Sequence, residues 1–327
     1  FNVKKMLTSK VTSQLSPADK TAIVYLVTIA FIIVIFSYRI ESWVWLCAGH
    51  AALVALVVLI AHSNRVSISP PLSLSPSHPP ALTRFRLFLR GWYPVALIPI
   101  TYKELSYLIP LVHPGDFDSA LAAIDYRIFG AHPTIWLERF TWPPVTEVLQ
   151  LTYSTYYLLP VILGAVLWRK RRFEEFHFWV FIVVLGFYLS YVGYIDVPAI
   201  GPRFLPEIVE AQTKPLTGIL FFKTVREALD RAEGITRDCF PSGHTELTLL
   251  VLYYASKFHR KVFWWLLPLG SGIIISTVYL RYHYVIDVVA GALLAFAIVM
   301  IAKPLYQWMG GRRLADATPS TNGATRL

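Results

Sequence analysis

The sequence has few charged residues and almost no cysteine. Asp, Glu, Lys and Arg make up only 15% of its 327 residues, whereas soluble proteins usually carry about a quarter. The two cysteines are Cys47, within an apolar run, and Cys239, within a polar loop, so we expect neither a disulfide framework nor a metal site. No internal repeat is recognisable. These features exclude a soluble globular domain and a disulfide-rich secreted domain.

Long apolar segments take the place of the missing charge. Hydrophobic residues make up 55% of the chain, and the mean hydropathy is +0.52. Segments of this length and composition predict an all-α polytopic membrane protein with about eight transmembrane helices. The expected spans are residues 21–38, 43–61, 91–112, 146–168, 176–197, 243–257, 262–280 and 284–302.

The basic residues lie in short clusters beside these apolar segments. The formal net charge of +10 would also suit a nucleic-acid partner, but such clusters are typical of the cytoplasmic ends of membrane helices. We therefore expect a membrane, and no nucleic acid, as the partner. With the N-terminal lysines in the cytoplasm, the basic loops 62–90, 169–175 and 258–261 and the C-terminus fall on the same side. Both termini are thus expected to be cytoplasmic.

Composition divides the chain into five parts. A polar N-terminal tail and a two-helix extension come first, and we expect no cleavable signal peptide. A proline-rich linker separates the extension from the main body, and a small-residue tail follows that we expect to be cytoplasmic and disordered. In order, these parts are residues 1–20, 21–62, 63–90, 91–303 and 304–327.

Two segments of the body are too polar to span a membrane. Residues 113–145 mix charged and aromatic side chains, which predicts helices lying in the membrane interface. Residues 198–242 form a long polar loop, within which 217–233 has a helical pattern. In the count of spans both segments fall on the outer (periplasmic, extracellular or lumenal) side.

Two histidines and an aspartate are expected at that outer face. His283 and Asp287 are four residues apart and share one face of a helix. A carboxylate near an imidazole holds one tautomer and raises the basicity of the far nitrogen. His244 opens the sixth expected span and can donate a proton. This set predicts phosphoryl transfer, in which His283 attacks phosphorus, Asp287 holds His283 and His244 protonates the leaving oxygen.

Further groups at the same face can bind phosphate. Arg203 and Arg281 offer forked donors, and Ser242 offers a hydroxyl. Gly243 permits a tight turn before a helix whose first N–H groups attract anions. The expected chemistry therefore needs neither a cofactor nor a metal, and the phosphohistidine would be cleaved by water or by an alcohol.

Each motif alone has a simpler explanation. A His-x-x-x-Asp pair is more often a hydrogen bond at a helix end, and isolated arginines at a membrane surface often snorkel. Their coincidence on one face favours a site. A transporter or channel is an alternative, with a pathway formed by Lys103, Glu104, Glu246 and Asp287, although the chain lacks the repeated halves common in transporters.

The motifs resemble those of the type 2 phosphatidic acid phosphatase superfamily. Its signature is Lys-x6-Arg-Pro, then Pro-Ser-Gly-His, then Ser-Arg-x5-His-x3-Asp. The second block is matched in full by Pro241-Ser-Gly-His244. In the third block Ser276, His283 and Asp287 have the expected spacing.

The chain departs from this signature at the cations. Thr277 stands where the third block has arginine, and Arg281 is the candidate to replace it. In the first block Arg203 matches, but Asp196 and Phe204 stand where lysine and proline are expected.

The resemblance covers residues 91–303 and implies a six-helix catalytic core that acts on a lipid phosphate or phosphodiester. Ser276-Thr-Val-Tyr-Leu280, followed by His283-Tyr284 and Asp287, is similar to the inositol phosphorylceramide synthase branch. Ser242-Gly-His-Thr245 is similar to sphingomyelin synthases. Such enzymes transfer a phosphorylated head group to a hydroxyl, so a lipid or polyol acceptor in place of water stays open. A lipid-binding pseudo-enzyme is a further alternative.

Overall fold

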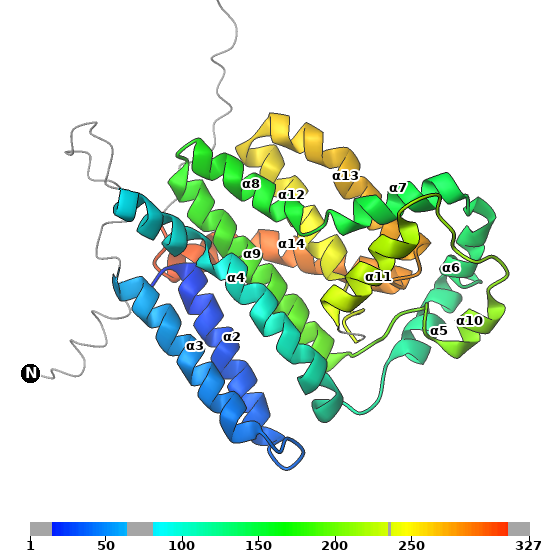
Figure 1. Ribbon diagram of the computed structural model, residues 1–327, viewed down its shortest axis with the longest axis horizontal. Helices are drawn as coiled ribbons and strands as arrows, with labels where there is room; N and C mark the ends of the chain where they lie inside the picture. The colour runs from blue at the N-terminus through cyan, green and yellow to red at the C-terminus, as the bar shows by residue number, and fades with distance from the viewer. Residues whose placement is uncertain (1–14, 64–80, 235–236, 313–327) are drawn as a thin grey trace, which may run out of the picture.

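The computed structural model describes residues 15–63, 81–234 and 237–312. Every regular element in these ranges is a helix. The long helices form a bundle, and the shorter ones gather at one of its ends, on the right in Figure 1. The prediction of an all-α polytopic membrane protein is therefore confirmed.

Six helices in the described ranges are long and apolar enough to cross a membrane. They agree in order with six of the eight expected spans. Their bounds are α2 (Pro17–Ile35), α3 (Trp43–Ser63), α4 (Ala81–Val112), α9 (Phe173–Asp196), α13 (Arg260–Tyr279) and α14 (Val285–Trp308).

The fourth expected span is a bent pair, α7 (Pro143–Ser154) and α8 (Leu158–Arg169), whose axes differ by 50°. Pro160 has no N–H to donate to the carbonyl of Tyr156. The hydroxyl of Thr155 donates to a carbonyl three residues back (2.7 Å), which competes with regular helix pairing. Counted as one span, the pair brings the total in the described chain to seven.

The sixth expected span is shorter than a membrane crossing requires. Helix α12 (Gly243–Phe258) has 16 residues, or about 24 Å at 1.5 Å per residue, against about 30 Å of hydrocarbon. It packs against α8, α9, α13 and α14. The residue after α12 is His259, whose side chain accepts the N–H of Val262 and caps the start of α13. Because α12 is enclosed by other helices, its length need not match the bilayer.

The proline-rich linker is shorter than expected. Helix α4 begins at Ala81, ten residues before the expected span at 91, so residues 81–90 are helical. At the other end, α14 continues to Trp308. The remaining parts of the expected tails and linker, residues 1–14, 64–80 and 313–327, lie outside the described residues.

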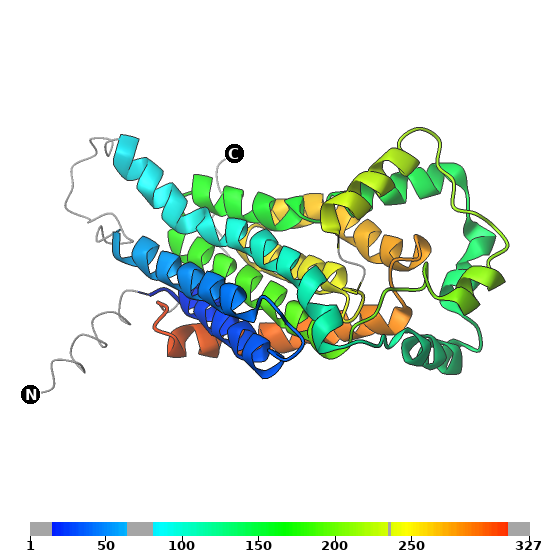
Figure 2. The ribbon, with the colours of Figure 1, turned by 60° about the horizontal axis from the view of Figure 1, so that its bottom comes forward.

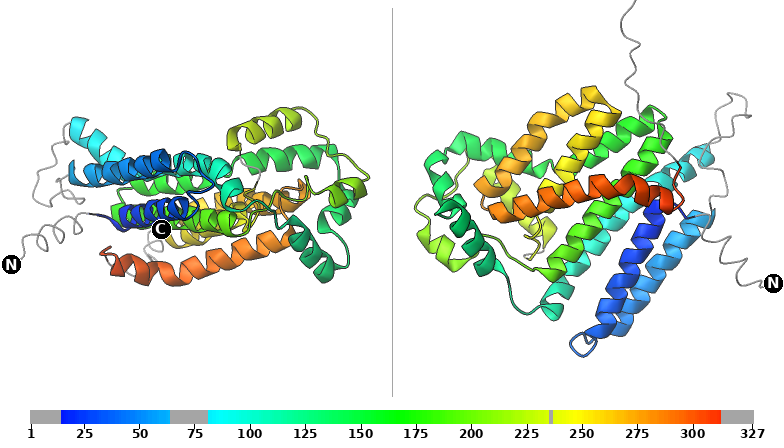
Figure 3. Two further views of the ribbon diagram at one scale, coloured as in Figure 1. Left: turned by 90° about the horizontal axis from the view of Figure 1, so that it is seen from below. Right: turned by 180° about the vertical axis from the view of Figure 1, so that it is seen from behind.

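Helix α9 is the centre of the bundle. It contacts α2, α4, α8, α12 and α14, and 83% of its most apolar window is buried. A helix enclosed on all sides is hydrophobic on all sides, which explains its uninterrupted apolar sequence. Figure 3 shows α14 crossing the bundle on the face opposite to α4.

The basic cluster 169–172 and the short helices lie at opposite ends of the bundle (Figure 2). Lys20 donates to the carbonyl of Met309 (2.5 Å), and Arg172 donates to the carbonyl of Phe258. The start of α2 therefore lies beside the end of α14, at the end that also carries the basic cluster 169–172. Helices α12 and α14 begin at the opposite end. There the short helices α5 (Asp118–Phe129), α6 (Pro133–Trp136), α10 (Pro206–Ala211) and α11 (Phe222–Glu233) gather (Figure 2).

A buried ion pair joins α2 to α4. Asp19 is fully buried and accepts from both terminal nitrogens of Arg90, one of them at 2.8 Å, and from the hydroxyl of Tyr93. Arg90 is itself buried. The carboxylate and the guanidinium compensate each other's charge, and burial of either charge alone would be costly.

We predict that Asp19→Asn lowers the free energy of unfolding by about 3–5 kcal/mol, because it leaves Arg90 charged, buried and unpaired. Thermal unfolding of the purified protein in detergent measures the change. Glu175→Gln is the matched control. It removes the part-exposed partner of Arg172 and should shift stability by less than about 1 kcal/mol. Equal effects of the two variants would contradict this account.

Candidate active site

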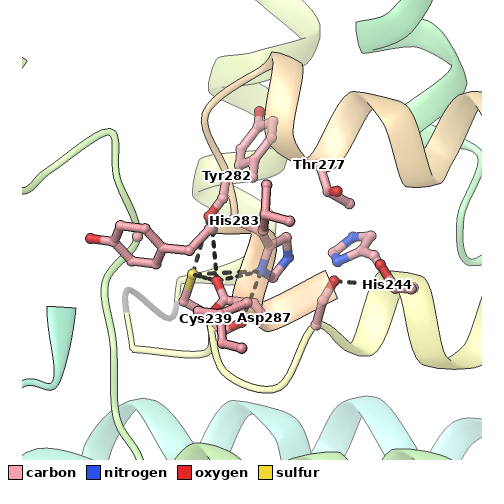
Figure 4. Close-up of polar contacts among 12 residues, drawn as sticks. Cys239, His244, Thr277, Tyr282, His283 and Asp287 are labelled. Carbon is pink, nitrogen blue, oxygen red and sulfur yellow. Dashed lines mark hydrogen bonds and ion pairs between the residues drawn. The ribbon is translucent and has the colours of Figure 1, made fainter. Parts of the chain in front are cut away.

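Two histidines face each other where α12 and α14 begin (Figure 4). His244 is the second residue of α12, and His283 lies in the turn between α13 and α14. Their ring centroids are 5.7 Å apart, and the ring planes meet at 60°. His283 is buried, whereas His244 is half-buried. The structure thus brings together the two histidines that the sequence predicts.

A backbone carbonyl determines the tautomer of His283. Its Nδ1 lies 2.8 Å from the carbonyl oxygen of Cys239. A carbonyl only accepts hydrogen bonds, so Nδ1 carries the proton, and the neutral imidazole has its lone pair on Nε2. Asp287 Oδ2 lies 3.5 Å from the same Nδ1. The carbonyl of Cys239 therefore shares the role expected of Asp287 alone.

Asp287 organises the backbone and a thiol around His283. Its Oδ2 accepts from the thiol of Cys239 (2.9 Å) and from the N–H of Tyr284 (2.8 Å). Burial raises the pKa of the Cys239 thiol, and the nearby Asp287 raises it further. The thiol therefore stays protonated and donates. The second oxygen of Asp287 is buried and has no hydrogen-bond partner among the described residues.

Cys239 is a site residue that the sequence did not reveal. It was expected in a polar loop, but it is buried against His283 and Asp287. One donor atom from each of these three residues lies within 4.8 Å of the others, a spacing that a single Zn²⁺ ion can bridge. Cys239 lies two residues before Pro241-Ser-Gly-His244, and this proximity in sequence was the available signal.

Aromatic rings hold His244. Tyr153 stacks on its imidazole with centroids 4.4 Å apart, and the ring of Tyr156 lies at 4.1 Å. Tyr153 also stacks on Tyr282 at 4.3 Å, nearly parallel. Tyr153 and Tyr156 come from the end of α7 and the turn before α8. The break between these two helices therefore supplies the rings that orient His244.

Helices α12 and α14 are joined at their first turns. The N–H of Ser242 donates to the carbonyl of Asp287 (3.0 Å), and Gly291 allows the carbonyl of Ser242 to pass closely, since any Cβ there would collide with it. The hydroxyl of Ser242 accepts the N–H of Thr245 (3.3 Å) as a helix cap. The N–H groups of Gly243 and His244 start the helix and have no acceptor within it.

Arg281 is held by other segments. Its guanidinium donates to Glu138 (2.8 Å), to the carbonyl of Lys214 (2.7 Å) and to the side chain of Gln212. Its backbone adopts a left-handed conformation, with φ of 67°. These three bonds involve both terminal nitrogens of the guanidinium, while its buried Nε has no hydrogen-bond partner among the described residues.

Arg203 lies over the ring of the residue before His283, and Thr277 binds the backbone of His283. Arg203 pairs with Asp230 (2.8 Å) and lies over the ring of Tyr282, 4.6 Å from its centroid. The carbonyl of Thr277 accepts the N–H groups of Tyr282 and His283, both at 2.9 Å. Figure 4 shows the Thr277 side chain beside the two imidazoles. Thr277, which stands where the signature has arginine, thus orients the backbone of His283.

Two carboxylates of α5 hold the loops beneath the site. Asp118 binds the turn after α9, and Asp125 binds the start of α14. Burial raises the pKa of Asp125, and the N–H groups that it accepts lower it. The donors are the N–H groups of Ile200 and Gly201 (both 2.8 Å) and the Tyr284 hydroxyl (2.9 Å) for Asp118, and the N–H groups of Val285 (2.7 Å) and Ile286 (2.9 Å) for Asp125.

A cavity of about 460 Å³ leads to His244. Its wall is mostly apolar and aromatic and comes from α4, α8, α9 and α11. Its polar lining includes Lys103, Glu233, Asp238 and His244. Burial, reinforced by Asp238, raises the pKa of Glu233 to about 8. Burial also raises the pKa of Asp238, which accepts the hydroxyl of Tyr102 at 2.6 Å.

The charged pair within the third span has two separate roles. Lys103 lines the cavity and donates to the last carbonyls of α11, including that of Glu233 (3.0 Å). Glu104 pairs with His50 of α3 at 3.3 Å. Each side chain therefore has a partner within the fold.

Comparison with known proteins agrees with this geometry. The PAP2 superfamily profile matches residues 119–301. A PA-phosphatase related-family protein of Dictyostelium discoideum is 26% identical over 164 residues, which is 44% of this chain and 30% of that protein. The chain thus covers less than a third of that relative's length. No solved structure matches the chain.

The matched region takes in both histidines, Asp287 and Cys239, together with the helices that hold them. It also covers more than half of the sequence. The chain therefore belongs to the PAP2 superfamily.

Proposed function

We propose that the protein is an integral-membrane lipid phosphatase or phosphotransferase that acts through a phosphohistidine on His283. Membership of the PAP2 superfamily supports a phosphatase-type function. The observation that carries the proposal is the meeting of His244 and His283 beside a largely apolar cavity whose wall comes from membrane-spanning helices.

In the first step Nε2 of His283 attacks phosphorus. A P–N bond forms, and the bond between phosphorus and the leaving oxygen breaks. His244 gives a proton to that oxygen. The carbonyl of Cys239 accepts the remaining N–H of His283, and the carboxylate of Asp287 stabilises the positive charge that develops on the ring.

In the second step an acceptor oxygen attacks the phosphohistidine. His244 removes the proton of the acceptor, the P–N bond breaks, and His283 is regenerated. The anionic oxygens of phosphorus are stabilised by Arg203 and by the N–H groups that start α12. Neither step uses a cofactor.

The cavity supports a lipid substrate. Pockets of this size hold large organic ligands in an apolar environment, and α4, α8 and α9 give this one a wall suited to an acyl chain. The phosphate then lies at the polar lining near His244. The basic cluster 169–172 is at the opposite end of the bundle, which favours a site on the outer face.

A head-group transferase is the second candidate. The similarity of residues 276–287 to inositol phosphorylceramide synthases favours it, and Glu233 and Asp238, which line the same cavity as His244, can accept hydrogen bonds from an acceptor's hydroxyls. A transport pathway is less well supported, because Lys103 and Glu104 already have partners in the fold.

We predict that His283→Ala lowers turnover of a lipid phosphate at least about 1000-fold, because it removes the nucleophile. Phosphate release from phosphatidic acid in mixed micelles is the measurement. His62→Ala, on α3 and away from the site, is the control and should keep full activity. Normal turnover by correctly folded His283→Ala would sink the assignment.

Product analysis separates water from alcohol as the acceptor. Purified protein in vesicles of phosphatidic acid should release inorganic phosphate, and this release should require His244, which activates water. If the protein is a transferase, a phosphodiester lipid with added ceramide or diacylglycerol should instead give a new phosphodiester without free phosphate. If neither inorganic phosphate nor a new phosphodiester forms in either mixture, both enzymatic functions are contradicted.

A further inference from the structure

The site has fewer cations at its motif positions than its superfamily signature provides. Thr277 and Asp196 replace an arginine and a lysine. Arg281, the expected substitute, is bound to Glu138 and to the carbonyl of Lys214. Of the motif cations only Arg203 is left, so another segment has to supply charge for a phosphate dianion.

Helix α11 brings a second arginine to the place that Arg203 occupies. The guanidinium carbon of Arg226 lies 5.4 Å from the ring centroid of Tyr282, and that of Arg203 lies 4.6 Å from the same centroid. Tyr282 is the residue before His283 and stacks on Tyr153, which in turn stacks on His244. Both guanidiniums therefore lie against the ring of the residue next to His283, and Tyr153 separates that ring from His244.

The two guanidiniums differ in their charged partners. Arg203 forms an ion pair with Asp230 at 2.8 Å, whereas within the described ranges Arg226 lies over the rings of Phe222 and Tyr282 and forms neither a hydrogen bond nor an ion pair. Burial lowers the pKa of Arg226, and the neighbouring Arg203 lowers it further. Arg203 therefore has Asp230 as its partner and lies near Glu233 and Asp238, whereas the half-buried Arg226 has no carboxylate paired with it and can bind an anion.

Charged groups fix both ends of α11. At its start, Glu147 of α7 accepts four consecutive N–H groups, those of residues 219–222, at 2.7–3.2 Å. At its end, Lys103 of α4 donates to the carbonyls of Ala232 and Glu233. A carboxylate at the N-terminus and an ammonium at the C-terminus both match the helix dipole. This anchoring holds Arg226 over Tyr282.

We propose that Arg226 binds the phosphoryl oxygens of the substrate together with Arg203, and so replaces the arginine that is absent at position 277. The proposal rests on the lipid phosphate chemistry proposed above. It assigns α11, a helix outside all three signature blocks, to the phosphate-binding site. It also makes Glu147 a positioning residue for that site.

The test uses inorganic phosphate as a probe of the full-length protein in detergent micelles. Arg226→Gln keeps a long polar side chain without the charge. Its inhibition constant for phosphate, and its KM for phosphatidic acid, should rise at least about tenfold through loss of a charge-assisted contact. Arg226→Lys keeps the charge but not the forked donors of arginine. Its inhibition constant for phosphate and its KM for phosphatidic acid should rise roughly two- to fivefold. Arg231→Gln, exposed on the same helix, should match the wild type.

A second readout separates this proposal from the proposed function. Phosphate should raise the Tm of the wild type, of Arg231→Gln and of the inactive His283→Ala, but much less that of Arg226→Gln. If the wild type hydrolyses phosphatidic acid while Arg226→Gln keeps wild-type KM and phosphate inhibition, the inference is overturned and the function stands. If no variant turns over substrate but phosphate protection still depends on Arg226, the anion site stands and the function fails.

Glu147→Gln tests the positioning step. It weakens the acceptor for four N–H groups at the start of α11, and should raise KM for phosphatidic acid and the inhibition constant for phosphate in parallel, with little change in kcat. A fall in kcat with unchanged KM would instead indicate a general loss of structure, and would contradict a positioning role through Arg226.

Discussion

Buried carboxylates that accept backbone N–H groups hold the site end of this molecule together. Four of them come from the segment that runs from α5 to α7, and each binds the main chain of another segment: Asp118, Asp125, Glu138 and Glu147. The loops that they bind form little regular structure with one another, so their N–H groups would otherwise lack partners in a partly dry environment. An ionised carboxylate satisfies several such groups at once.

The chemistry of the site depends on this arrangement. Asp125 fixes the start of α14, from which Asp287 reaches the turn containing His283. Asp118 fixes the segment after α9, whose Ala199 carbonyl accepts the N–H of Cys239. The carbonyl of Cys239 then determines which nitrogen of His283 carries the lone pair. These hydrogen bonds thereby position the loop that carries His283, the proposed nucleophile.

Part of this was predictable from the sequence. The length of the apolar segments predicts the six long helices, because the backbone groups of a segment that crosses lipid have to be hydrogen-bonded within a helix. The spacing of His283 and Asp287 and the motif that ends in His244 predict that the two histidines belong to one site. The break between α7 and α8 and the early start of α4 were not predictable in this way, because tertiary packing decides how a helix tolerates Pro160 or a basic first turn.

The partners of single side chains were the least predictable feature. Arg281 looked free in the sequence, but Glu138, more than a hundred residues earlier, binds it. In the sequence, Arg226 is one of several charged residues in a segment with a helical pattern. In the structure, Glu147 and Lys103 bind the two ends of that helix, and Arg226 lies over Tyr282. Such pairings depend on contacts between distant segments, which local pattern and spacing do not encode.

The stereochemical course at phosphorus tests the central claim most directly. A substrate with a chiral, isotopically labelled phosphoryl group can be turned over with water or an alcohol as acceptor. Attack by His283 followed by attack of the acceptor is two in-line displacements, and predicts overall retention of configuration. Inversion would mean that the acceptor attacks phosphorus directly, and would contradict a phosphohistidine intermediate.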